Sequence, residues 1–178
     1  VRTTKEQLGL IEPQYNIISQ PLPESHRRLY RLLTSRLARQ LESQNDFEYS
    51  ERLSSIRRHI MDIMRAASNP RVLCQMQEFV GALSPDIVRD VLETESWKIR
   101  ETIDIVNTLV SENKKVIVWS CFNENTDELA IRLSHLNPKI IRGSTPSAKL
   151  DASTIEEEIE DYTREGILRD FKTNDDCR

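Results

Sequence analysis

The sequence predicts an α/β protein in which a mostly helical region precedes a parallel β–α–β unit. In the first half, leucines recur at every fourth residue, which is the pattern of an amphipathic helix. In the second half, the short apolar runs KVIVW (115–119) and KII (139–141) flank a helical pattern. An uninterrupted apolar run is typical of a parallel strand that is covered on both faces. We therefore expect a right-handed β–α–β crossover there.

The helical region begins after an extended segment. Residues 14–22 (QYNIISQPL) contain the β-branched Ile17 and Ile18 and are closed by Pro21 and Pro23, so they predict a strand or an extended crossing segment. A first helix is expected from Glu24, and a second is expected to end at Asn69 because Pro70 disfavours helical geometry before it. The residues predicted to face the core of these two helices are Leu29, Leu33, Leu37 and Leu41 in the first, and Ile56, Ile60, Ile63 and Met64 in the second.

Later helices have recognisable starts. Ser84 followed by Pro85 is typical of a helix N-terminus, and another helix is expected from about Ser96. Residues 126–136 (TDELAIRLSHL) supply the helix of the β–α–β unit. The two tryptophans, Trp97 and Trp119, are expected in the core.

Composition excludes several classes of protein. The chain has 178 residues, a formal net charge of −4 and no apolar run near the roughly 20 residues of a membrane span, so no membrane partner is expected. Its three cysteines and three histidines form no metal-ligand pattern. All ten basic residues between Glu24 and Arg71 are arginine. This bias indicates either a phosphate-binding face or the solvated outer faces of helices.

The ends of the two predicted strands form a candidate binding edge. In open parallel sheets, ligands bind outside the carboxyl ends of the strands. Hydroxyl groups and free main-chain amides at such an edge suit phosphate oxygens. The alternative is an ordinary turn beside a helix that is capped by Asn125. The candidate nucleic-acid-binding residues are Ser120, Cys121, Asn123, Arg142, Gly143, Ser144, Thr145 and Lys98.

Six segments in order resemble the SWI/SNF-related branch of the superfamily two helicases. They are RTTK (2–5), SNPRVL (68–73), Ser96 with Lys98, the motif IV-like run 116–122, the GST turn (143–145), and Arg164 with Leu168 and Phe171. The resemblance extends over nearly the whole chain, and its specificity comes from the order of the segments.

The resemblance implies an α/β fold in three parts. Residues 1–22 would be an inter-lobe connector with an extended strand, and residues 23–95 a helical region. Residues 96–178 would be the first half of the second RecA-like lobe, truncated before motifs V and VI. The partners implied are double-stranded DNA, the first helicase lobe and the remainder of the second lobe. The location implied is nuclear in a eukaryote, or cytoplasmic and nucleoid-associated in a bacterium.

The family's nucleotide chemistry needs parts that this sequence lacks. A phosphate loop, a DExH acid and an arginine finger are absent, so no catalytic residue is assigned. ATP and Mg²⁺ are implied for the complete protein, and none is expected to bind this chain alone. Two departures from the family pattern are His26, where glutamine is usual, and a long acidic stretch after Thr145. The alternative function is a non-catalytic protein-interaction module built on a degenerate helicase lobe.

Overall fold

A computed structural model describes residues 12–43, 49–79, 81–148 and 160–177. These ranges form seven α-helices and two short 3-10 helices and contain no β-strand. None of the helices within them has the length and hydropathy that a bilayer crossing requires. The RTTK segment and residues 149–159 of the acidic stretch lie outside the described ranges.

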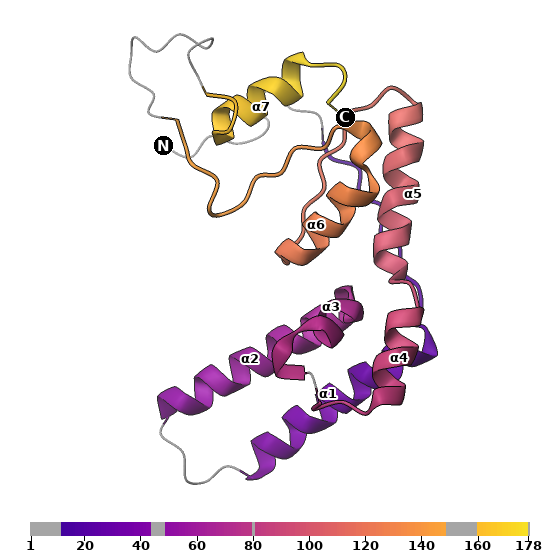
Figure 1. Cartoon of the computed structure of the whole chain (residues 1–178), viewed down its shortest axis with the longest axis vertical. Coiled ribbons are helices and arrows are strands. Elements are labelled where there is room, and N and C mark those ends of the chain that lie inside the picture. The colour runs from indigo at the N-terminus through magenta and orange to yellow at the C-terminus, as the bar shows by residue number, and fades with distance from the viewer. Residues whose placement is uncertain (1–11, 44–48, 80, 149–159, 178) are drawn as a thin grey trace.

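The first part of the molecule is a packed group of helices. Helices α1 (Glu24–Ser43) and α2 (Tyr49–Ser68) lie along each other, and α3 (Pro70–Gln75) and α4 (Pro85–Glu93) pack beside them (Figure 1). The 3-10 helix η2 (Gln77–Phe79) follows α3. The predicted helix end at Asn69 is confirmed: this residue has φ −146° and ψ 89°, outside helical geometry.

One hydrophobic core holds this part together. Its centre includes Leu29 and Leu33 from α1, Leu73 from α3 and Val91 from α4, all buried. The predicted leucine stripe therefore reaches the core at its start, whereas Leu41 is exposed.

The predicted apolar face of α2 is partly wrong. Ile60 and Met64 are exposed, while the small Ala66 is fully buried in the core cluster. A small residue lets neighbouring helices approach closely, so size outweighed hydropathy in setting the buried face.

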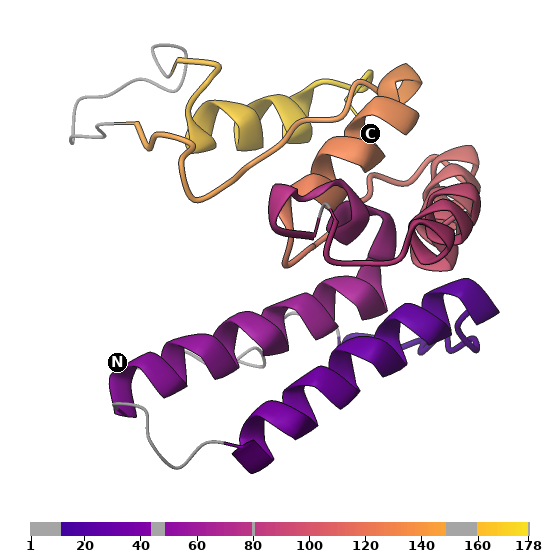
Figure 2. The same ribbon diagram turned by 60° about the horizontal axis from the view of Figure 1, so that its bottom comes forward.

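The second part contains α5 (Trp97–Ser111), α6 (Asn123–Arg132), the 3-10 helix η3 (Ser134–Leu136) and α7 (Arg164–Thr173). Figures 1 and 2 show α5 continuing from α4, with α6 beside it and α7 beyond α6. Residues 12–23 are extended and meet α5 through a hydrogen bond from Gln20 Nε2 to Glu101 Oε2 (3.1 Å).

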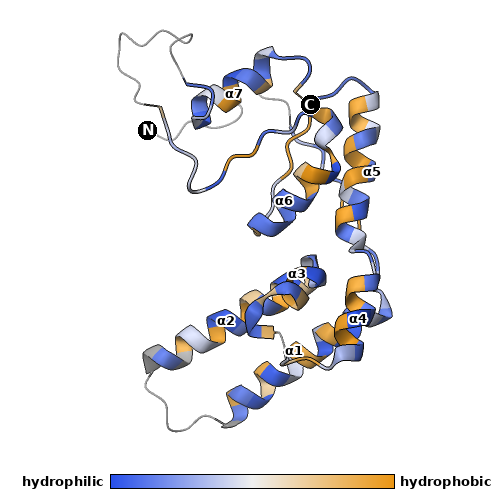
Figure 3. Cartoon of the chain, in the orientation of Figure 1, coloured by the Kyte–Doolittle hydropathy of each residue, from blue (hydrophilic) through white to orange (hydrophobic). Residues whose placement is uncertain are grey.

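The predicted parallel β–α–β unit, and with it the partial RecA-like lobe, is wrong. The two apolar runs flank α6 as expected, but neither belongs to a β-ladder in the described ranges. Ile117 and Trp119 are 63% and 90% exposed rather than buried, and Figure 3 shows hydrophobic colouring within the run before α6. A strand requires a neighbour that supplies its hydrogen bonds, and an apolar run does not provide one. The core position predicted for Trp119 is wrong for the same reason.

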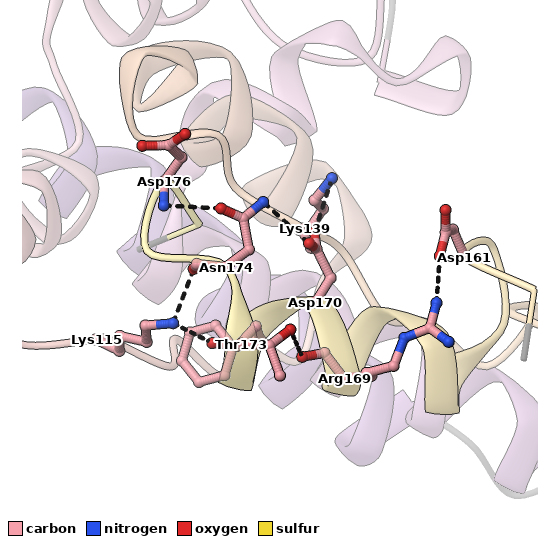
Figure 4. A network of polar contacts seen from close by, with 9 residues as sticks. Lys115, Lys139, Asp161, Arg169, Asp170, Thr173, Asn174 and Asp176 are labelled. Atoms are coloured by element: carbon pink, nitrogen blue, oxygen red, sulfur yellow. Dashed lines mark hydrogen bonds and ion pairs between the residues drawn. The ribbon is translucent and has the colours of Figure 1, made fainter. Parts of the chain in front are cut away.

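Lys115 and Lys139, the first residues of the two segments that were predicted as strands, both contact α7. Lys115 Nζ donates hydrogen bonds to the carbonyl oxygens of Phe171 (2.6 Å) and Asn174 (2.8 Å) at the end of α7. Lys139 Nζ forms an ion pair with Asp170 at 3.2 Å, and Figure 4 shows both contacts. Polar contacts to a helix thus hold the segments that the sequence predicted as strands.

Candidate nucleic-acid interface

The predicted GST corner is a tight turn with its own hydrogen bonds. The Thr145 amide donates to the Arg142 carbonyl oxygen at 3.1 Å, and the Arg142 amide donates to Thr145 Oγ1 at 2.9 Å. These two reciprocal bonds fix the four residues from 142 to 145. The Thr145 hydroxyl therefore has a structural role in the turn and is only half-exposed.

Arg164, the first residue of α7, holds this turn from one side. Its guanidinium donates to the carbonyl oxygens of Thr145 (3.0 Å), Arg142 (3.3 Å) and Gly143 (3.1 Å). Its amide also donates to the Pro146 carbonyl oxygen at 2.9 Å. The sequence pattern singled out Arg164 as part of a helix motif, but its contact with the turn was not predicted.

Two main-chain donors of the turn have no partner in the described part of the chain. The Gly143 and Ser144 amides make no hydrogen bond within the described part of the chain, and the Ser144 side chain is exposed. A Cβ atom added to Gly143 would meet nothing within 4 Å, so the space beside it is open. Consecutive free amides next to a hydroxyl group are donors of the kind that bind anions.

Arg142 connects the turn to α6. Its guanidinium forms an ion pair with Asp127, an exposed residue of that helix. Its Nε atom is buried without a hydrogen-bond partner. A phosphate at the turn would thus meet an arginine that already has a carboxylate neighbour.

The other predicted corner is arranged differently. Ser120 Oγ accepts from the Phe122 amide (3.2 Å) and lies 3.4 Å from Asn125 Nδ2. It therefore closes the local turn before α6 rather than presenting a free hydroxyl group. Cys121 and Asn123 are exposed, and no side chain caps the N-terminus of α6.

Lys98 lies in the first turn of α5, and its side chain is exposed. Its ammonium group lies 5.8 Å from the centroid of the Trp97 ring. Within the described residues, no hydrogen bond or ion pair joins Lys98 to either corner. The structure thus brings Arg142, Gly143 and Thr145 together in one turn, whereas Lys98 makes no hydrogen bond or ion pair with any of them.

A polar junction that the sequence did not predict connects the two parts of the molecule. Asn125 Nδ2 donates to Ser68 Oγ at 2.8 Å, and Ser96 Oγ donates to the Ser68 carbonyl oxygen at 2.9 Å. Asn69 Nδ2 donates to Glu128 Oε2 at 2.7 Å. The alternative in which Asn125 caps α6 is not seen; Asn125 and Glu128 instead bind the end of α2 and the residue after it. The only signal in the sequence was a set of small polar residues at helix ends.

Two further features near the interface are the lack of a metal-ligand group in the described ranges and the role of the Glu165 carboxylate. No group of three or more metal-ligating side chains gathers in the described ranges. Glu165 accepts a hydrogen bond from the Ala148 amide at 2.7 Å, and this bond holds the pKa of the carboxyl group below its usual range. The carboxylate thereby anchors the segment that follows the GST turn.

No family model, curated protein or solved structure matches the chain. The resemblance to the SWI/SNF-related helicases therefore stays a prediction from the order of its motifs.

Proposed function

We propose that the chain contributes DNA-backbone contacts to an ATP-dependent double-stranded DNA translocase of the SWI/SNF-like family. In the complete protein, ATP and Mg²⁺ would be bound by parts outside this sequence, and the remainder of the translocase would pack against this chain. The order of the six motifs supports the family.

The observation that carries the proposal is the turn at residues 142–145. Arg164 occupies the carbonyl oxygens of the turn, and the unpaired Gly143 and Ser144 amides remain for an incoming phosphate. Main-chain amides, serine hydroxyl groups and arginines are the groups that proteins use for DNA phosphates. Such contacts position a duplex without reading its sequence.

The test is a titration of two unrelated, fluorescein-labelled duplexes followed by anisotropy at about 50 and about 200 mM salt. Arg142→Gln should weaken binding to both duplexes equally and lower the salt slope by about one. Asp127→Asn should strengthen binding because it frees Arg142 from its ion pair. Arg100→Gln, at an exposed residue of α5, is the matched control.

Two results would contradict the proposal. One is the absence of binding at low salt. The other is an Arg142→Gln variant that behaves like Arg100→Gln while Asp127→Asn changes nothing. The family assignment itself predicts DNA-stimulated phosphate release by the complete translocase and none above background by this chain alone. An inactive complete protein would contradict it.

The alternative, a protein-interaction module, is favoured by one observation. Ile117 and Trp119 are largely exposed on an extended segment that nothing covers in the described part of the chain. A chain of this kind would show no salt-dependent affinity for duplex DNA, so the same titration distinguishes the two functions.

A further inference from the structure

A cleft of about 690 Å³ is lined by residues of α3, of the end of α4 and the segment after it, and of α6. It is separate from the turn at 142–145, because no residue of that turn lines it. Its volume is within the range of sites that bind small ligands or a few residues of a peptide.

The apolar side of the cleft includes an unusually exposed residue. Val72 from α3 is buried and Leu92 from α4 is half-buried, whereas Ile131 on α6 is 74% exposed. Ile131 therefore offers an apolar surface at the cleft that the protein itself does not cover.

The cleft has an excess of negatively charged side chains. Four carboxylates and two guanidinium groups line it, which gives a net charge of −2. Arg132 pairs with Glu95 at 2.6 Å and with Glu128 at 3.7 Å. In the described structure, the side chains of Glu93 and Glu124 make no hydrogen bond or ion pair.

One donor in the cleft is also free. Arg71 lines the cleft and makes no hydrogen bond or ion pair with any described residue. A ligand complementary to the cleft would therefore bring cations for the two glutamates and an acceptor for this arginine. An aliphatic polyamine brings cations but no acceptor, and an acidic segment brings the wrong charge for Glu93 and Glu124.

We propose that the cleft binds a basic, partly apolar peptide segment of another protein. Lysine or arginine side chains of this segment pair with Glu93 and Glu124, and an apolar side chain packs against Leu92 and Ile131. A main-chain carbonyl oxygen of the segment accepts a hydrogen bond from Arg71. A peptide segment carries all three groups together.

The test titrates the whole chain into a fluorescein-labelled peptide of about seven alternating lysine and leucine residues, followed by anisotropy. The double variant Glu93→Gln, Glu124→Gln should weaken binding roughly tenfold. The control, Asp104→Asn with Asp175→Asn, removes the same charge from exposed residues outside the cleft and should change the affinity less than about twofold.

A second pair of variants tests the apolar contact. Ile131→Ser should weaken binding about fivefold, because the variant loses apolar surface that the bound peptide would bury. Ile17→Ser, at another exposed isoleucine outside the cleft, should leave the affinity unchanged. Circular dichroism of each variant checks that the helices are intact.

Three results would overturn the proposal. The first is equal weakening by the cleft and control double variants, which means general attraction to an acidic chain. The second is tighter binding of the peptide with glutamate in place of lysine. The third is full displacement of the peptide by equimolar spermidine, which would assign the cleft to a polyamine. Because none of these variants lies in the turn at 142–145, the outcome is independent of DNA binding.

Discussion

The two parts of the molecule are stabilised in different ways. Helices α1–α4 share one buried cluster that includes Leu29, Leu73 and Val91. The part from α5 to α7 buries fewer apolar side chains, and several of its large ones, among them Trp119 and Ile131, are exposed. Hydrophobic burial therefore stabilises the first part. In the second part, side-chain hydrogen bonds and ion pairs contribute a larger share of the stabilisation.

Because of this difference, we expect the two parts to lose stability through different kinds of substitution. A packed core loses stability when volume is removed, because the surrounding side chains relax only partially. A part held by hydrogen bonds loses stability when a buried donor is removed, because its acceptor is then left unsatisfied. The variants below test the two kinds of stabilisation separately.

The largest effect is expected from Leu29→Ala in α1. Leu29 is fully buried in the core cluster, so its truncation should lower the free energy of unfolding by about 2–5 kcal/mol. Leu41→Ala on the same helix should cost less than about 1 kcal/mol because Leu41 is exposed. Urea unfolding followed by circular dichroism measures both values, and similar losses for the two variants would contradict a core centred on Leu29.

The next effect concerns the polar junction. Asn125 is buried and donates to Ser68 Oγ, so Asn125→Ala should destabilise the contact between the two parts by about 1–3 kcal/mol. Amide hydrogen exchange should then accelerate in α6 while the core residues of α1 keep their protection. Asn107→Ala, at an exposed residue of α5, is the control. Uniform acceleration through both parts would mean that the chain unfolds as one unit.

Local signals in the sequence were sufficient for the helices. The proline after Asn69 and the serine–proline pair at Ser84 and Pro85 predicted a helix end and a helix start that the structure confirms. These signals act within a few residues, through the geometry that proline imposes on its neighbour.

The sheet and the junction could not be predicted in this way. The run 115–119 has the hydropathy of a buried strand, but strand formation depends on a partner elsewhere in space. The bond from Asn125 to Ser68 joins residues that are 57 positions apart in the sequence. The bonds from Arg164 to the turn join residues that are 19 to 22 positions apart. Asparagine and arginine are common on helix surfaces, so nothing local distinguishes these two.

Six of the eight candidate site residues are exposed, while Arg142 and Thr145 are half-buried and form the turn.

A smaller, pH-dependent effect is expected from His26. This side chain is fully buried on α1, and its Nε2 lies 3.3 Å from the Thr94 carbonyl oxygen after α4, while Nδ1 has no partner. Burial is the main cause that lowers the pKa of His26, and the charge of Arg71 on α3 acts in the same direction; hydrogen bonds to the Thr94 and Val91 backbone oppose them. The Ser25 and Thr94 hydroxyl groups bond to each other nearby.

The sign follows from the lowered pKa. The folded state prefers neutral His26, so its stabilising effect is complete above the unfolded value of about 6.5 and is lost as the pH falls towards the folded value. Unfolding free energy should therefore decrease between about pH 7.5 and 5.5. His26→Gln should flatten this slope, whereas His135→Gln, at an exposed residue, should not. An unchanged slope in His26→Gln would assign the pH dependence to other groups.

The smallest effect is expected where a lysine holds the end of α7. Lys115→Met keeps the aliphatic stem but removes the donor to the Phe171 and Asn174 carbonyl oxygens, which should cost about 1 kcal/mol. Hydrogen exchange should accelerate in the last turn of α7, because a cation there also interacts favourably with the helix dipole. Lys114→Met removes only an exposed ion pair with Glu112 and should leave this exchange unchanged. Equal exchange in the two variants would mean that the extended segment stays in place without its lysine, and that apolar contacts stabilise the second part after all.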